Sequence, residues 1–138
     1  MRELGGPVAA PPAGPQDLLV PWGDARPVAL ALIPATSPAD ALTTLGWLGP
    51  ANYDLEGAAI ARIAVSWEER YHLTPVGIDF DLLMLQMPPR GLSRPEVMSL
   101  LAEVYRVCPD SYEQGGFPDL AAFVRAVESH PVLGLWWD

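Results

Sequence analysis

The sequence predicts a single domain of the α/β (α+β) class, in which a sheet of about four strands is covered by two pairs of helices. Short apolar runs that suit strands alternate with longer segments whose apolar residues recur every three or four positions, as on one face of a helix. Half of the 138 residues are apolar, which is enough for one buried core.

Residues 1–27 are predicted to form an extended arm, and residues 28–138 a single globular domain. Six prolines stand among glycines and alanines in the first segment: Pro7, Pro11, Pro12, Pro15, Pro21 and Pro27. Proline has a fixed φ and no backbone N–H, so neither a helix nor a central strand is sustained there. Residues 18–22 are apolar, and docking of the arm on the domain stays open.

The first half of the domain predicts a strand and two helices. Residues 28–33 read VALALI, a short apolar run that suits a buried strand. Ser37 is then a candidate N-cap for a short helix that ends about residue 45. A longer helix is predicted over residues 56–71, with apolar residues, Trp67 among them, on one face.

The second half begins with a predicted hairpin. Residues 75–78 and 82–87 are two strand-like runs on either side of an acidic turn, residues 79–81. Ser93 and Glu96 have the spacing of a capping box, which begins a helix that reaches Cys108.

A last helix is predicted after Pro118, and a last strand over residues 132–137. The order strand, helix, helix, strand thus occurs twice, and a shift of 59 residues aligns Pro50 with Pro109 and Tyr53 with Tyr112. We interpret this as a candidate internal duplication. Under it, the loops PANYD and PDSYE are equivalent and face each other across a pseudo-twofold axis.

The charge of the chain limits its partners. It carries 17 acidic and 8 basic residues, for a formal net charge of −9, and every basic residue is arginine. The absence of lysine excludes Schiff-base chemistry and a phosphate-loop lysine. Nucleic acids and anionic membranes need clustered basic residues, so we expect neither as a partner. A basic protein or a neutral small molecule suits the charge better. The sequence does not determine the oligomeric state.

A cytoplasmic location is expected. The first twenty residues lack the charged start and apolar stretch of a signal peptide. No apolar run reaches the roughly 18 residues that a membrane span needs.

Cys108 is the obvious candidate nucleophile, with His72 and His130 as candidate bases. It falls at the negative C-terminal end of its helix, close to Asp110, and both features raise a thiol pKa. We therefore predict a buried structural cysteine. Two isolated histidines, with Asp79 and Asp81 in a turn, do not make a metal site, and we expect neither a metal nor a cofactor.

Candidate binding residues lie in two loops beside prolines and in the helix at residues 56–71. Rigid polar loops are common places for recognition, and helix capping is the alternative reading of the same residues. The candidates are Asn52, Tyr53, Glu68, Arg70, Asp110, Tyr112 and Gln114, together with Trp137. Trp136 and Trp137 point to opposite faces of the last strand, so one enters the core and the other needs a cover, either from the chain itself or from a partner.

Five strings in order, LGWLGPANY, SWEERY, FDLLML, CPD and WWD, resemble the family called domain of unknown function 4253. The resemblance covers about residues 27–138 and implies a bacterial, cytoplasmic protein without an assigned activity. One departure is the pair His72 and Leu73, where the family pattern has a small Gly-Ala pair. The matching positions are Trp47, Asn52, Trp67, Glu68, Arg70, Asp81, Cys108, Pro109, Asp110, Gln114, Trp136, Trp137 and Asp138.

Two functions follow as hypotheses. The first is a non-enzymatic protein, immunity-like or regulatory, that binds a basic partner through its acidic surface. The alternative is a small enzyme or small-molecule-binding protein with a polar pocket. The pocket of the second hypothesis would be lined by five polar candidates: Asn52, Glu68, Arg70, Asp110 and Gln114. The two hypotheses differ in geometry, because a pocket requires at least three of these side chains to converge on a concave site.

Overall fold

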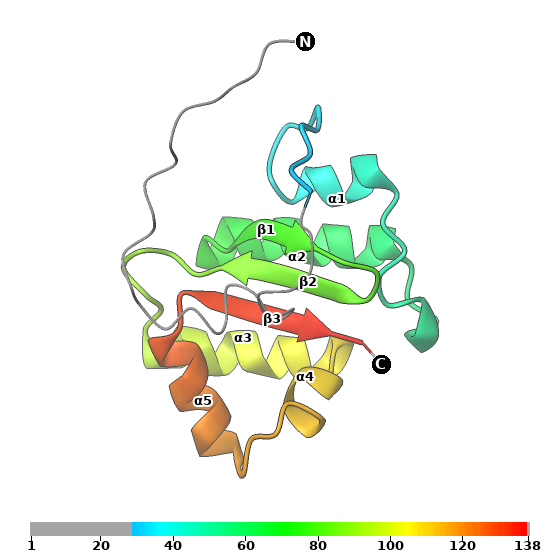
Figure 1. Ribbon diagram of the computed structural model, residues 1–138. Coiled ribbons are helices and arrows are strands. Elements are labelled where there is room, and N and C mark those ends of the chain that lie inside the picture. The colour runs from blue at the N-terminus through cyan, green and yellow to red at the C-terminus, as the bar shows by residue number, and fades with distance from the viewer. Residues whose placement is uncertain (1–28, 138) are drawn as a thin grey trace.

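The computed structural model describes residues 29–137, so the predicted arm over residues 1–27 lies outside the described part. Figure 1 shows the order of the elements along the chain. They are α1 (Asp40–Leu45), the 3-10 helix η3 (Ala51–Tyr53), α2 (Gly57–Tyr71), β1 (Thr74–Ile78), β2 (Leu82–Gln86), α3 (Arg94–Val107), α4 (Asp110–Glu113), α5 (Leu120–Ser129) and β3 (Val132–Trp136).

The strands form one antiparallel sheet in the order β1-β2-β3. β1 and β2 are the predicted hairpin, in which Ile78 pairs with Leu83 across the acidic turn at residues 79–81. The predicted last strand, β3, pairs with the other edge of β2, with Leu82 opposite Trp136. The middle of the sheet is therefore β2, the most buried of the strands.

The prediction of a strand over residues 28–33 is wrong for residues 29–33, which have no regular secondary structure. Leu30 and Leu32 are fully exposed, each at 102%. An apolar run without alternation does not by itself distinguish a strand from other apolar segments. A strand also needs a free edge, and β1 carries Pro75, which has no N–H to donate. The described sheet thus has three strands instead of about four.

Local signals set the ends of the helices. The capping box of Ser93 and Glu96 is present at the start of α3. The side chain of Asp119 accepts a hydrogen bond from the backbone of Ala122 and caps α5. Ser37 accepts one from the backbone N–H of Asp40, although α1 begins later than predicted.

His72 ends α2 in the left-handed region, with φ of 57°. Its backbone N–H donates to the carbonyl of Glu68, as in a helix C-cap. Glycine is the favoured residue at such a position because it has no Cβ. His72 therefore puts a β-carbon where the backbone favours none, while Leu73 beside it is buried in the core.

The core lies on one face of the sheet, against α1, α2, α3 and α5. Figure 1 shows α2 and α3 behind the sheet, so that the viewer faces its other side. Side chains alternate between the two faces along each strand. Those in the core are Leu83, Leu85, Leu133 and Leu135. Those on the opposite face are Leu82, Met84 and Val132, with Trp136 packed against them. The predicted helix pairs thus share one face.

The two segments aligned by the 59-residue shift have the same order of elements. η3, α2 and β1 follow Pro50, and α4, α5 and β3 follow Pro109. β1 and β3 both pair with β2, so they occupy the two edges of one sheet. The first unit lacks its predicted first strand, and common ancestry of the two units stays a prediction.

Candidate functional site

Three of the predicted binding residues meet where η3 approaches α4. The hydroxyl of Tyr53 donates a short hydrogen bond to Asp110, and the side-chain amide of Gln114 donates to the other carboxylate oxygen at 3.0 Å. Asp110 is buried, at 4% exposure. The loops PANYD and PDSYE therefore contact each other, which joins α4 to the loop before α2.

The hydrogen bond to Asp110 raises the pKa of Tyr53 to about 12, because ionisation of the phenol would place a second negative charge beside the carboxylate.

The neighbouring candidates, Asn52 and Tyr112, do not join the group formed by Tyr53, Asp110 and Gln114. Asn52 is exposed, and the ring of Tyr112 packs against Phe123 and Tyr105. Tyr112 therefore belongs to the packing around α5.

Cys108 has no exposed surface, and its sulfur contacts two oxygen atoms, as the prediction of a structural cysteine requires. Its Sγ lies 3.0 Å from the hydroxyl of Ser111 and donates to the carbonyl of Trp136 at 3.0 Å. The same hydroxyl accepts from the backbone N–H of Trp136 at 3.1 Å. Burial raises the pKa of the Cys108 thiol, and the charge of Asp110 adds to this. This group therefore ties the end of β3 to the start of α4.

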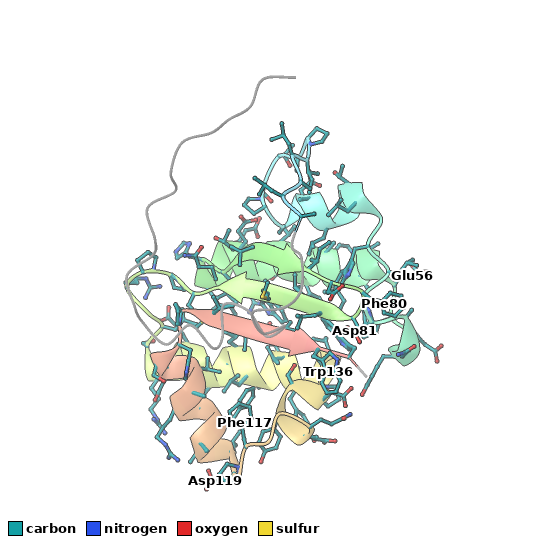
Figure 2. The ribbon with its side chains drawn as sticks, in the orientation of Figure 1. Glu56, Phe80, Asp81, Phe117, Asp119 and Trp136 are labelled. Atoms are coloured by element: carbon teal, nitrogen blue, oxygen red, sulfur yellow. The ribbon has the colours of Figure 1, made fainter. Side chains whose placement is uncertain are left out.

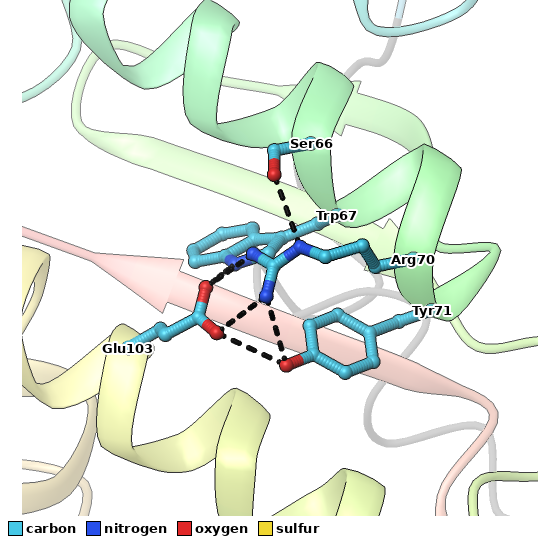
Figure 3. A network of polar contacts seen from close by, with 5 residues as sticks. All are labelled: Ser66, Trp67, Arg70, Tyr71 and Glu103. Atoms are coloured by element: carbon cyan, nitrogen blue, oxygen red, sulfur yellow. Dashed lines mark hydrogen bonds and ion pairs between the residues drawn. The ribbon is translucent and has the colours of Figure 1, made fainter.

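Glu103, on α3, organises the network that Figure 3 shows between α2 and α3. Its carboxylate accepts from the indole N–H of Trp67 at 2.9 Å and from the hydroxyl of Tyr71 at 3.0 Å. Arg70 donates to both carboxylate oxygens, at 2.7 and 2.5 Å. Arg70 also donates to the hydroxyl of Ser66. The Trp and Arg of the SWEERY string thus share one acceptor on another helix.

The two hydrogen bonds from Arg70, with those from Trp67 and Tyr71, lower the pKa of Glu103 to about 2. The sequence reasoning missed Glu103, because it lies 33 residues from Arg70 and belongs to no string. Glu68, which was a candidate, is only half-buried and takes no part in the network. Arg70 is therefore occupied by a structural contact.

The polar pocket of the enzyme hypothesis does not assemble from its five candidates. Of Asn52, Glu68, Arg70, Asp110 and Gln114, only Asp110 and Gln114 contact each other, four residues apart at one helical turn. Arg70 lies with Glu103, between α2 and α3. These contacts agree with the alternative reading, in which the candidate residues cap helices or pair with their neighbours.

Trp137 is a core residue, whereas Trp136 lies on the outer face of the sheet. The indole N–H of Trp137 donates to the carbonyl of Val107 at 2.7 Å. The ring of Trp136 is half-buried, and its N–H donates to the carboxylate of Asp81 at 3.3 Å. Of the two neighbouring indoles, Trp136 is therefore the one that keeps exposed surface.

A surface that the sequence reasoning missed lies at the end of the sheet where the hairpin turns. The indole N–H of Trp47 donates to the carbonyl of Asp79 at 2.7 Å, which joins residues 46–58 to residues 79–81. Leu48 and Phe80 project there, at 69% and 73% exposure. Neither segment contains an arginine. We call this surface the acidic end, defined as Leu48, Asp54, Glu56, Asp79, Phe80 and Asp81.

Figure 2 shows Glu56, Phe80 and Asp81 on the same side of the molecule, with Trp136 beside them. The signal that could have found the acidic end was Phe80 itself, an aromatic residue between two aspartates in a turn.

Among residues 29–137, no three His, Cys, Asp or Glu side chains are grouped closely enough to hold a metal ion. No helix in the described part is long and apolar enough to cross a membrane.

The fold and its contacts define a small α+β domain in which, within residues 29–137, three of the four tryptophans and the cysteine lie in the core. The chain belongs to the family described as Domain of unknown function (DUF4253), whose model matches residues 29–138. This confirms the resemblance drawn from the five strings. No curated protein and no solved structure matches the chain.

Proposed function

We propose that this protein is a non-enzymatic binding protein, immunity-like or regulatory, and that its acidic end docks a basic protein partner. The observation that carries the proposal is that two segments joined by the hydrogen bond from Trp47 to Asp79 expose two apolar side chains, Leu48 and Phe80, and carry four carboxylates. Apolar anchors inside a charged rim are the usual anatomy of a protein interface.

Electrostatics favours a basic partner. The chain has a net charge of −9, and three of the described arginines are paired with glutamates away from the acidic end. Those pairs are Arg70 with Glu103, Arg90 with Glu96 and Arg94 with Glu128. A surface of one sign steers an oppositely charged partner and weakens as salt is added.

Affinity capture with matched variants tests the proposal. Asp54 has a left-handed φ of 54°, which asparagine also tolerates, so Asp54→Asn with Glu56→Gln removes two charges with little strain. Phe80→Ser removes the aromatic anchor. The controls are Glu68→Gln with Glu69→Gln, which removes two charges elsewhere, and Met98→Ser, which removes an exposed apolar side chain on α3.

We expect the wild type and both controls to capture the same basic protein, and both acidic-end variants to lose it. Titration calorimetry with the purified pair should show weaker binding as salt is raised. Capture that is equal for all variants, or a partner with a net negative charge, would contradict the proposal.

A further inference from the structure

An apolar pocket of about 240 Å³ lies between the outer face of the sheet and α5. The sheet contributes Leu82, Met84 and Trp136, and α5 contributes Phe123 and Val127. Figure 2 labels Trp136, together with Phe117 from the loop before α5, which also lines the pocket. A cavity of about 150 Å³ holds benzene, so this pocket has room for an aromatic molecule of two rings.

Gly134, in the middle of β3, keeps the pocket open. It lines the pocket and pairs with Met84 on β2. A β-carbon at this position would meet only Leu82, at 4.0 Å, and Gly134 does not have a positive φ. Glycine weakens a strand, because it has no side chain to pack. The backbone of β3 therefore does not require glycine here, and what the glycine provides is space.

The polar groups at the pocket select the charge of its ligand. His130 lines it, and its Nδ1 contacts the carbonyl of Ala126, which can only accept a hydrogen bond. Nδ1 therefore carries the proton in the neutral ring, which leaves Nε2 as an acceptor. Among the described residues, no group donates to this Nε2. Asp110 also lines the pocket, and its carboxylate disfavours an anionic ligand.

We propose that this pocket binds a small, neutral aromatic molecule of about two rings that carries one hydroxyl group, with the hydroxyl donated to Nε2 of His130. The rings fill the space above Gly134, between Trp136 and Phe123. This inference does not rest on the proposed function. The two surfaces are lined by different residues, and Trp136 of the pocket donates a hydrogen bond to Asp81 of the acidic end.

The test is titration calorimetry of the full chain with three probes. 2-Naphthol has the proposed shape and donor, 2-methoxynaphthalene lacks the donor, and 2-naphthoate is an anion. We expect 2-naphthol to bind about three- to tenfold more tightly than 2-methoxynaphthalene, which is the range that one hydrogen bond supplies. We expect no heat from 2-naphthoate. Equal affinity for all three probes would overturn the proposal.

Two variants locate the site. Gly134→Val fills the pocket with a side chain that suits a strand, so we expect an unchanged or higher Tm and at least tenfold weaker binding of 2-naphthol. His130→Phe keeps an aromatic ring without the acceptor, so we expect the preference for 2-naphthol over its methyl ether to disappear. Arg125→Gln, on α5 outside the pocket, is the control and should bind as the wild type does.

One outcome would assign the pocket to the chain itself. If the wild type binds no probe, but a full-length variant with residues 18–22 replaced by serine binds 2-naphthol, the apolar residues before the domain occupy the site, and the proposed ligand is wrong. Binding that survives Gly134→Val would equally overturn the proposal, because the probe would then lie elsewhere.

Discussion

The indole rings of Trp47 and Trp137 meet edge to face in the core, with their centroids 5.7 Å apart and their planes at 64°. Each indole N–H also donates to a backbone carbonyl, Trp47 to Asp79 and Trp137 to Val107. Such an aromatic pair contributes roughly 0.5 to 1.5 kcal/mol beyond its buried area. The LGW and WWD strings, almost at opposite ends of the domain, are therefore parts of one contact.

The loop around Trp47 leaves no room for a side chain at Gly57. A β-carbon at this position would overlap the carbonyl oxygen of Trp47. We expect Gly57→Ala to lower the free energy of unfolding by about 2 to 3 kcal/mol, despite the better helix propensity of alanine, since the overlap is with backbone. Urea denaturation measures this. Gly134→Ala, which has space for its methyl group, is the control, and equal stabilities for the two variants would refute the clash.

Glu103 is expected to stabilise the protein through the donors that it accepts. Glu103→Ala leaves the buried indole N–H of Trp67 without its acceptor, which costs about 1 to 3 kcal/mol. Glu103→Gln keeps an oxygen acceptor and should cost less. Chemical denaturation of the two variants at neutral pH compares them, and a glutamine variant as unstable as the alanine variant would show that the acceptor is not what matters.

The same carboxylate predicts a dependence of stability on pH. The pKa of Glu103 is lowered to about 2 in the folded protein, from the ordinary value of 4.5. Its contribution is therefore fully present above about pH 4.5 and is lost as the pH falls towards 2. We expect the difference in unfolding free energy between the wild type and Glu103→Gln to shrink over this range. The stability of the Glu103→Gln variant should still fall in acid, because the pKa of Glu96 is also lowered to about 2.

The thiol of Cys108 should be unreactive in the folded protein. It is fully buried and its pKa is raised, so little thiolate forms and reagents do not reach it. We expect an aromatic disulfide reagent to modify it at pH 8 only as fast as the protein unfolds, and at once in urea. Rapid modification of the native protein, without a change in its circular dichroism, would reopen the role of nucleophile.

His72→Gly is expected to stabilise the protein by about 0.5 to 1 kcal/mol. The residue has a φ of 57°, and removing its β-carbon relieves the cost of the left-handed conformation. Thermal and urea unfolding measure the gain. His72→Ala keeps the β-carbon and should not show it, so a gain shared by both variants would point to the imidazole instead.

Local patterns explain why much of the fold was predictable. The hairpin at residues 74–86, the capping box of Ser93 and Glu96, and the apolar face of α2 each depend on residues a few positions apart. The strand over residues 28–33 was the exception. An apolar run becomes a strand only when an edge is available for it, and this depends on the rest of the sheet.

The candidate site was less predictable than the fold. Tyr53, Asp110 and Gln114 were candidates, and the candidate duplication predicted that their loops face each other, but the pairing of Tyr53 with Asp110 joins residues 57 positions apart. Nothing near Glu103 in the sequence marks it as the acceptor for Trp67 and Arg70. The pocket above Gly134 likewise arises where β3 and α5 lie side by side.

The sequence by itself determined α1, α2, α3, α5, the hairpin, the family and the burial of Cys108, because spacing, caps and composition act over short distances along the chain; the short helices η3 and α4 were expected as loops. Only the tertiary structure decided which of two neighbouring indoles faces outward, what Arg70 binds, and where open apolar space remains. These depend on how α2, α3 and α5 pack on one sheet, and such packing is a sum of many weak contacts between segments that are distant in sequence.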